Sequence, residues 1–369
     1  MSLFYKKFFL IIDIITSIYI QKYDKTAKEN IILKNGRKYL DICLHDLIKQ
    51  NSFYIKKPKI SIIIPVYNCQ NSISFSIISI QNQIMSDYEI ILINDNSKDN
   101  SRKFIENIQK KDSRIILINN KRNMGTLYSR NIGVLASRGK YIFPMDNDDM
   151  LFNQKLFGLL NRVGIINNYD IIGYKVIYGF NYNSKVEHMF HEPYIINKNI
   201  NYDNHQNLKF HSVNNNDIHL WGKSIKSEIY KKVIELMGIK RYSVYLCYGE
   251  DNVMTFLLFS YANSYKFLPI YGLFHLNSNN TASFTLSKNH KYFSKIYFLD
   301  ILYDFTKNNF KEKNYVFSYL SRNINSRKQL DTKNSIYLRK VLNKILNCNY
   351  IKKKNKLKIL EIFKTYLNH

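Results

Sequence analysis

The sequence predicts an α/β fold with a mostly parallel mixed sheet flanked by helices. Two observations support this prediction. Between residues 59 and 150, short apolar runs of strand length alternate with longer stretches whose apolar residues recur every three or four positions. Each apolar run also ends abruptly in a cluster of polar residues. Buried strands that alternate with helices are typical of a parallel sheet with right-handed crossovers.

The expected elements follow one another closely along this part of the chain. We expect strands at residues 60–66, 89–93, 114–118 and 140–145. We expect helices at residues 73–84, 99–111 and 125–138, the first with Ile73, Ile77, Ile80 and Ile84 on one apolar face. Beyond residue 150 the periodicity weakens, and the polar, Asn-rich residues 181–217 are expected to form an active-site loop or an insertion.

The first 58 residues are predicted to form a helical extension. Residues 8–20 are strongly apolar, but Asp13 interrupts them, and they are fewer than the roughly 20 residues that span a bilayer. Lys6 and Lys7 precede them as in a signal anchor, yet no small-residue cleavage site follows. We expect a helix packed on the main domain, with a short membrane contact as the alternative.

Composition restricts the class of protein. A hydrophobic content of 45% in 369 residues indicates a globular chain with a substantial core. The four cysteines form no CxxC pair, which argues against a zinc knuckle or a disulfide framework and fits a reducing compartment. The net charge of +27 favours an anionic partner, but the lysines are spread along the chain rather than gathered in one stripe. A genome with A/T-rich codons is the favoured explanation of these lysines, so a nucleic-acid-binding protein is the second hypothesis.

The last strand before residue 150 ends in crowded carboxylates. Asp146, Asp148 and Asp149 lie within four residues of one another. Carboxylates this close repel one another and raise each other's pKa unless a cation lies among them. Mg²⁺ or Mn²⁺ is suited to such a site because both prefer oxygen ligands. The alternative is a solvated turn in which Asp149 caps the next helix.

Four segments, in this order, resemble glycosyltransferase family 2 enzymes of the GT-A fold, a Rossmann-like sheet flanked by helices. They are Ser61 to Asn68, Ser79 to Gln83, Asn94 to Asp99, and Asp146 to Asp148. The resemblance covers about residues 59 to 285 and continues at 218–223 and 249–252. The third of these segments, which follows the second strand, usually begins with two aspartates in the family, whereas here Asn94 replaces the first and Asp95 keeps the second.

The resemblance implies a division of the chain into three regions. Residues 1–58 form the N-terminal helical extension and residues 59–285 the GT-A glycosyltransferase domain. Within that domain, residues 59–150 are the nucleotide-binding half and residues 151–285 the acceptor half. Residues 286–369 form a basic helical C-terminal region that the family does not explain.

The donor implied by the resemblance is a nucleotide-diphospho-sugar, with a UDP-sugar favoured over GDP- or dTDP-sugars. Asp95 would accept a hydrogen bond from the imide N–H of uracil, and Pro65, Tyr67 and Asn68 would shape the wall against the nucleotide. The alternative for Asp95 is to cap the following helix, and the alternative for Tyr67 is ordinary packing.

The same resemblance implies a metal site for Mn²⁺ or Mg²⁺. Asp148 would ligate the metal directly, while Asp146 would reach the ribose hydroxyls or the metal through water. His275 matches a position where some GT-A enzymes place a third ligand, although a buried, hydrogen-bonded histidine is the alternative. Such a metal would stabilise the departing nucleoside diphosphate.

Three further side chains are candidates for contacts with the donor. Arg130 would either contact the diphosphate or pair with an acidic loop, and we favour the pairing. Lys223 is a second candidate for the diphosphate. Trp221 would either stack on a sugar ring or pack in the core.

Transfer of a sugar to a hydroxyl also needs a general base. The resemblance assigns this role to Asp251, with Glu250 helping to hold the acceptor. The alternative is that both acids simply favour a helix N-terminus through its dipole.

The sequence therefore predicts a metal-dependent inverting glycosyltransferase that acts on a hydroxyl of a glycan, lipid or protein. We expect a cytoplasmic protein, with a peripheral membrane contact as an option and a soluble acceptor slightly favoured. The alternatives are a basic protein that binds nucleic acid or a membrane surface, and an NTP-sugar nucleotidyltransferase. The nucleotidyltransferase should have a Gly-rich, basic loop after the first strand, and residues 65–71 contain neither glycine nor lysine.

Overall fold

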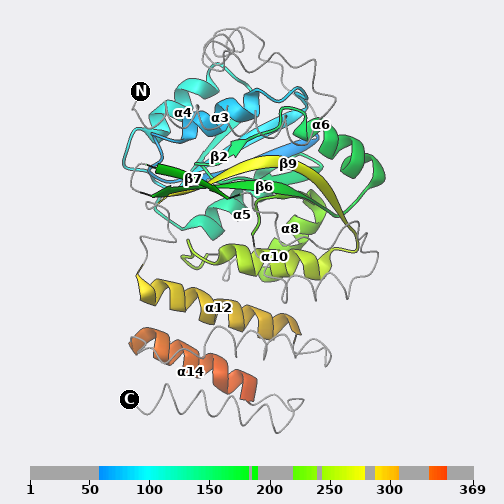
Figure 1. Cartoon of the computed structure of the whole chain (residues 1–369). Coiled ribbons are helices and arrows are strands. Elements are labelled where there is room, and N and C mark those ends of the chain that lie inside the picture. The colour runs from blue at the N-terminus through cyan, green and yellow to red at the C-terminus, as the bar shows by residue number, and fades with distance from the viewer. Residues whose placement is uncertain are drawn as a thin grey trace.

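The computed structural model describes residues 58–182, 185–189, 219–238, 243–278, 287–306 and 332–346. The predicted N-terminal extension, except its last residue, and most of the loop predicted at 181–217 lie outside this part of the chain. The described residues contain a nine-stranded sheet with the order β3-β2-β1-β4-β8-β6-β9-β5, and β7 pairs with β6. Helices cover both faces of this sheet (Figure 1).

The first half of the sheet has the predicted parallel arrangement. β1 (Ile60–Val66) lies between β2 (Tyr88–Asn94) and β4 (Tyr141–Pro144), and β3 (Ile115–Asn119) pairs with β2. Every residue of β1, β2 and β4 is buried. A strand that is covered on both faces needs apolar side chains on both, which explains the uninterrupted apolar runs.

Two apolar clusters lie on the two faces of β1. Ile62 belongs to the cluster that includes residues of α3 (Ile73–Gln81), whereas Ile63 belongs to the cluster that includes residues of α5 (Thr126–Ala136). Successive side chains of a strand point to opposite faces, so α3 and α5 cover opposite sides of the sheet.

The crossover helices end earlier than predicted. α3 stops at Gln81 and α4 covers only Ser101–Gln109. The prediction that Ile84 extends the buried face of α3 is wrong, because this side chain is 69% exposed. The chain turns after the helix because the buried Gln83 donates from Nε2 to the carbonyl of Asn153, at 2.7 Å.

α5 lies unusually close to the sheet. A Cβ atom at Gly133 would be 2.5 Å from Ile93 Cδ1 and 2.8 Å from Ile63 Cγ2, which is closer than side chains tolerate. Glycine at this position therefore allows the helix to approach β1 and β2 directly. This approach brings Arg130, earlier in the same helix, next to the ends of the strands.

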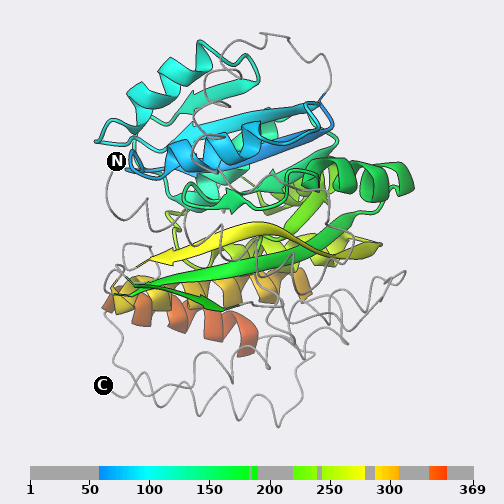
Figure 2. The ribbon, with the colours of Figure 1, turned by 45° about the horizontal axis from the view of Figure 1, so that its top comes forward.

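The second half of the sheet mixes strand directions. β6 (Ile171–Tyr182) and β9 (Tyr265–Ser278) form a long parallel pair, drawn in green and yellow in Figure 2. β8 (Lys223–Lys226) lies antiparallel between β4 and β6, β5 (Met150–Leu151) is antiparallel to β9, and β7 (Lys185–Met189) is antiparallel to β6. Among the described strands, only β5, β7 and β8 oppose the common direction, which confirms the mostly parallel mixed sheet.

Helices beyond residue 150 complete the fold. α6 (Leu156–Leu160) and a π-helical turn (Asn161–Ile165) lead from β5 to β6. α8 (Ser227–Met237) and α10 (Glu250–Tyr261) cover the same face of the sheet as α5. α12 (Lys288–Thr306) and α14 (Thr332–Leu346) stack beyond α10 as further layers (Figure 1).

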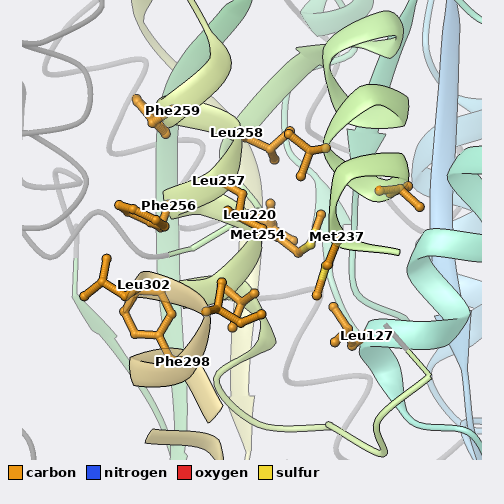
Figure 3. Packing of buried hydrophobic residues seen from close by; sticks show 14 of the residues in the cluster. Leu127, Leu220, Met237, Met254, Phe256, Leu257, Leu258, Phe259, Phe298 and Leu302 are labelled. Atoms are coloured by element: carbon orange, nitrogen blue, oxygen red, sulfur yellow. The ribbon is translucent and has the colours of Figure 1, made fainter. Parts of the chain in front are cut away.

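The C-terminal helices share their core with the main domain. Figure 3 shows Leu127 of α5, Met237 of α8, Met254 of α10 and Phe298 of α12 in the same apolar cluster. Nothing in this packing divides α10 from α12, so the boundary predicted near residue 285 stays a prediction. Within the described residues, no helix combines the length and the apolar character needed to cross a bilayer.

Candidate active site

The carboxyl ends of the four parallel strands bring the predicted site residues to one edge of the sheet. Asn68 follows β1, Asp95 follows β2, Asn120 follows β3 and Asp146 follows β4. Because the strands are parallel, their following loops lie side by side. Ligands of open α/β sheets bind at this edge.

The loop after β1 is held by reciprocal hydrogen bonds to the loop after β2. The N–H of Asn68 donates to Ser97 Oγ at 3.1 Å, and Asn68 Oδ1 accepts from the N–H of Lys98 at 2.7 Å. Asn68 adopts a φ of 49°, a left-handed conformation that asparagine tolerates better than most residues. The carbonyl of Pro65 accepts from Asn147 Nδ2 at 3.0 Å, which connects this loop to the acidic turn after β4.

Asp95 holds the turn that leads into α5. Its Oδ1 accepts from Asn120 Nδ2 and from the N–H of Met124, and its Oδ2 accepts from the N–H of Gly125, each at 2.8 Å. Asp95 therefore supports the N-terminus of α5 rather than that of the helix directly after it. A carboxylate offers roughly four acceptor positions, so these three bonds among the described residues leave room for one donor from a ligand. Tyr67, in the loop after β1, is half-exposed.

Arg130 connects carboxylates from distant parts of the chain. Its guanidinium, only 3% exposed, donates from Nη2 to Asp146 Oδ1 at 2.7 Å and from Nη1 to Asp251 Oδ1 at 2.9 Å. Glu250 Oε1 lies 3.5 Å from Nη1. The pairing with acidic side chains that the sequence favoured for Arg130 is therefore present, and it includes acids of both halves of the domain.

Glu250 and Asp251 occupy the first turn of α10. Gly249 precedes them with a φ of 74°, a left-handed conformation that glycine adopts without strain and that lets the helix begin at this point. A backbone hydrogen bond from Leu220 reaches Asp251 and favours its charged form. Burial has the opposite effect and raises the pKa of Asp251, while the charges of Arg130 and Lys223 lower it.

Asp146, Asp149 and His275 could together hold a metal ion. One ligand atom of each lies within 4.8 Å of the others. Asp149 is fully buried, and its Oδ1 lies 2.7 Å from Nδ1 of His275. Burial alone would lower the pKa of His275, but the charge of Asp149 and the hydrogen bond to it raise the pKa to about 9.

The ligand set of this group differs from the predicted one. Asp148, predicted to bind the metal directly, is outside the three-residue group, whereas Asp149 is inside it. The register of the sheet explains the difference, because Met150 of β5 pairs with Phe274 of β9. The preceding residue, Asp149, is thereby placed opposite His275.

The donor set of this group fits a divalent cation. Two carboxylates and one imidazole are ligands that Mn²⁺ and Mg²⁺ accept, with oxygen preferred. Burial and the neighbouring charges of Asp149 and Asp146 raise the pKa of Asp148 well above its ordinary value. The acidic turn therefore contains more negative charge than the folded chain neutralises there, and a bound cation would relieve it.

Trp221 packs against imidazole rings rather than facing an open site. Its indole stacks with His219 at 4.1 Å between ring centroids and with His275 at 5.0 Å. The side chain is buried, so packing, one of the two alternatives considered for Trp221, describes its role in this structure. This stack also fixes the plane of His275 beside Asp149.

Lys223 lies inside the protein near the predicted base. Its Nζ donates to the carbonyl of His219 at 2.6 Å, and the side chain is buried. Its positive charge lowers the pKa of Asp251. The structure thus places the charge of Lys223 near Asp251, and contact with a diphosphate stays a prediction.

Residues 243–248 belong to this region but carry no sequence signal that reveals it. The carbonyl of Leu246 accepts from the N–H of Leu127 at 3.0 Å, in the first turn of α5. Asp149 was also not predicted as a candidate ligand, although it stood in the acidic triplet, because its partner His275 is 126 positions away. Only the β5–β9 pairing reveals that contact.

The sequence is similar to known glycosyltransferases. Residues 61–226 match the family model described as Glycosyl transferase family 2. A Haemophilus influenzae protein named as an uncharacterized glycosyltransferase is 43% identical over 104 residues, which cover 28% of this chain and 42% of that protein. An Escherichia coli protein named UDP-Glc:alpha-D-GlcNAc-diphosphoundecaprenol beta-1,3-glucosyltransferase WfgD is 33% identical over 126 residues, 32% of this chain and 49% of that protein. The chain thus spans less than half of these relatives.

Solved structures identify the fold. The crystal structure of S. aureus TarS 1-349 in complex with UDP-GlcNAc matches with a TM-score of 0.58 at 13% identity, covering 83% of this chain and 87% of that chain. The fold is the GT-A fold, as the sequence predicts. This likeness shows the fold alone, whereas the family match shows that residues 61–226 are similar to glycosyltransferase family 2.

Replacement of Arg130 should destabilise the fold strongly. Arg130→Met leaves three acids without their shared counter-charge, so we expect a loss of about 3–5 kcal/mol in the free energy of unfolding. Urea denaturation at pH 7 measures it. Arg130→Lys is the matched control, because it keeps the charge but not the forked geometry, and should lose less. A loss below about 1 kcal/mol in Arg130→Met would show that the ion pairs contribute little.

Glu250 should make the stability depend on pH. Burial, followed by the charge of Asp251, raises the pKa of Glu250 to about 8 from an ordinary value of 4.5. A carboxyl with a raised pKa in the folded state contributes stability below its unfolded pKa and loses it as the pH rises through the folded pKa. Glu250→Gln cannot ionise, so its stability relative to the wild type should increase from pH 5 to pH 9.

Urea denaturation at several pH values in EDTA tests this expectation. Glu235→Gln, which removes an exposed acid of α8, is the matched control for the loss of one negative charge. The expectation is contradicted if the stability of Glu250→Gln relative to wild type stays constant or falls as the pH rises.

Proposed function

We propose that this protein is a metal-dependent, inverting glycosyltransferase that moves a sugar from a UDP-sugar to a hydroxyl of a lipid-linked glycan. The observation that carries this proposal is the contact of one buried guanidinium, Arg130, with Asp146 on the donor side and Asp251 on the acceptor side. A donor-binding acid and a candidate base are thus held on either side of one side chain, as a single displacement requires.

Asp146, Asp149 and His275 would hold Mn²⁺ or Mg²⁺. The ion, when bound, supplies a Lewis acid that stabilises the negative charge of the departing nucleoside diphosphate. Arg130 keeps Asp146 in place from the opposite side, at 2.7 Å. Asp148 adjoins this group and is the second candidate ligand from the acidic turn.

Asp251 is the proposed general base. Its carboxylate would take the proton of the attacking hydroxyl while the oxygen of that hydroxyl bonds to the anomeric carbon. The bond between the anomeric carbon and the diphosphate oxygen breaks at the same time, on the opposite face. The bond to Arg130 Nη1 at 2.9 Å orients the carboxylate and favours its charged form, which is the form that accepts a proton.

The donor and acceptor classes are supported by named relatives. WfgD is named for UDP-Glc and for a GlcNAc-diphosphoundecaprenol acceptor, and TarS is solved with UDP-GlcNAc. On this ground we favour a lipid-linked acceptor over the soluble one suggested by the sequence. The protein would then work at a membrane surface, in the cytoplasm, as a peripheral protein.

The rival functions have less support. Residues 65–71 contain no Gly-rich phosphate loop of the kind that a nucleotidyltransferase needs. The loop after β1 is held instead by hydrogen bonds of Asn68 with Ser97 Oγ and with the N–H of Lys98. A nucleic-acid-binding protein would not need a buried arginine between three carboxylates.

Donor binding tests the proposal directly. We expect a UDP-sugar to raise the melting temperature of the purified protein in Mn²⁺ more than GDP- or dTDP-sugars do, and EDTA to abolish this rise. Asp149→Asn and Asp148→Asn, tested side by side, show which acid the metal needs. Stabilisation by RNA that weakens with salt, with none by any nucleotide-sugar, would refute the proposal.

Asp251→Asn should lower the rate of sugar transfer without weakening the binding of the nucleotide. Loss of the base should lower kcat by roughly 10²- to 10⁴-fold, while the affinity for UDP in Mn²⁺ stays close to that of wild type. Single-turnover transfer from a radiolabelled UDP-sugar to a lipid-linked glycan measures the first effect, and calorimetry measures the second. Unchanged turnover in this variant would assign the base elsewhere.

A further inference from the structure

Two buried serines of α3 bind the backbone of the acidic turn and of β5. Ser76 is fully buried and Ser79 is 7% exposed, and they lie three residues apart, on the same side of the helix. Gln83, also buried, follows just after the helix. Ser79 and Gln83 are the first and last residues of the second segment that resembles the family. Buried polar groups are costly unless they are hydrogen-bonded, so their partners explain why they are there.

Ser76 holds the turn itself. Its Oγ lies 2.7 Å from the carbonyl oxygen of Asp149 and 3.0 Å from that of Asn147. A hydroxyl has one proton, which it can donate to either carbonyl or share between them. One side chain of α3 thus fixes the backbone on both sides of Asp148. These bonds use the backbone of the turn and not its carboxylates, so the carboxylates can still bind a cation.

Ser79 extends this contact to β5. Its Oγ accepts from the N–H of Leu151 at 3.0 Å and donates to the carbonyl of Ser76 at 2.7 Å. Gln83 continues the row with its bond to the carbonyl of Asn153, at 2.7 Å. The chain from the acidic turn to the residues after β5 is therefore bound at three successive points by α3 and the residue that follows it closely.

The position of Asp149 depends on β5, which is very short. β5 consists of only two residues, each with one partner in β9. A strand of this length forms few ladder bonds of its own, so its register against β9 needs support from outside the sheet. That register brings Asp149 Oδ1 to 2.7 Å from Nδ1 of His275, and Asp149 Oδ2 accepts from the N–H of Asp146 at 3.3 Å. The hydroxyls of α3 bind the backbone on both sides of this contact.

We infer that Ser76 and Ser79 are positioning residues of the proposed metal site, which fix the backbone from which Asp149 reaches Asp146 and His275. The inference rests on the proposed metal dependence. Both hydroxyls bind backbone atoms, so they act on the metal ligands only through the position of the turn. Groups that orient metal ligands in this way typically change metal affinity by about 10- to 100-fold when they are removed.

Binding of Mn²⁺ to the full chain, measured from the EPR signal of the free ion with and without UDP, tests the inference. We expect Ser76→Ala to raise the Kd for Mn²⁺ by about 10- to 100-fold. Ser79→Ala should raise it as well. Ser79→Thr keeps a hydroxyl that can reach the carbonyl three residues earlier, so it should restore most of the affinity.

Ser137→Ala is the matched control. Ser137 is also a buried serine, and its Oγ donates to the carbonyl of Val134 at 2.6 Å. It follows the end of α5, before β4 begins, and so lies at the edge of the sheet opposite the acidic turn. Its replacement should leave the Kd for Mn²⁺ unchanged. Urea denaturation in EDTA measures how much stability each alanine variant loses without metal.

The outcomes separate the positioning role from the metal site. Wild-type affinity for Mn²⁺ in both Ser76→Ala and Ser79→Ala would overturn the inference and leave the metal site standing, and so would an equal loss of affinity in Ser137→Ala. If Ser76→Ala does not fold in EDTA, the Ser79 variants decide, and equal affinities of Ser79→Ala and Ser79→Thr overturn the inference. A wild type that binds no Mn²⁺, with or without UDP, would refute the proposed metal site and the positioning role with it.

Discussion

The contact of Arg130 with three carboxylates is the constraint on which the site depends. Asp146, Glu250 and Asp251 come from the ends of β4 and the start of α10, and each would be costly to bury without a counter-charge. Because one guanidinium contacts all three, the distance between the turn after β4 and the start of α10 follows from its reach. α5 can place that guanidinium so close to the strand ends because Gly133 lets the helix lie directly on the sheet.

Much of the first half of the fold could be predicted from the sequence, because its signals are local. The strands at Ile60–Val66 and Tyr141–Pro144 are apolar throughout, as strands covered on both faces must be, and each is followed by its polar cluster. Parallel strands then bring Asn68, Asp95 and Asp146 to one edge. The acids that would pair with Arg130 could not be named individually, since two of them follow it by more than a hundred residues.

Contacts that depend on the register between two strands, or on a single side chain, could not be predicted from the sequence. The pairing of β5 with β9 determines that Asp149 meets His275, and no pattern in either segment reports that register. The end of α3 depends on Gln83, a polar residue that proved to be buried. Leu246 lies in a segment without periodicity, whose place is set by the hydrogen bond from the N–H of Leu127 to its carbonyl, at the start of α5.

The match to the family 2 model ends at residue 226, before Glu250, Asp251 and His275. The family match and the proposed active site therefore cover different parts of the chain. In a fragment cut at the family boundary, Arg130 would keep Asp146 but lose both acids of α10, and Asp149 would lose its histidine. Recombination between related enzymes at that border would join a donor half to a foreign α10. Such a hybrid could function only if the incoming helix again offered acids to the same arginine.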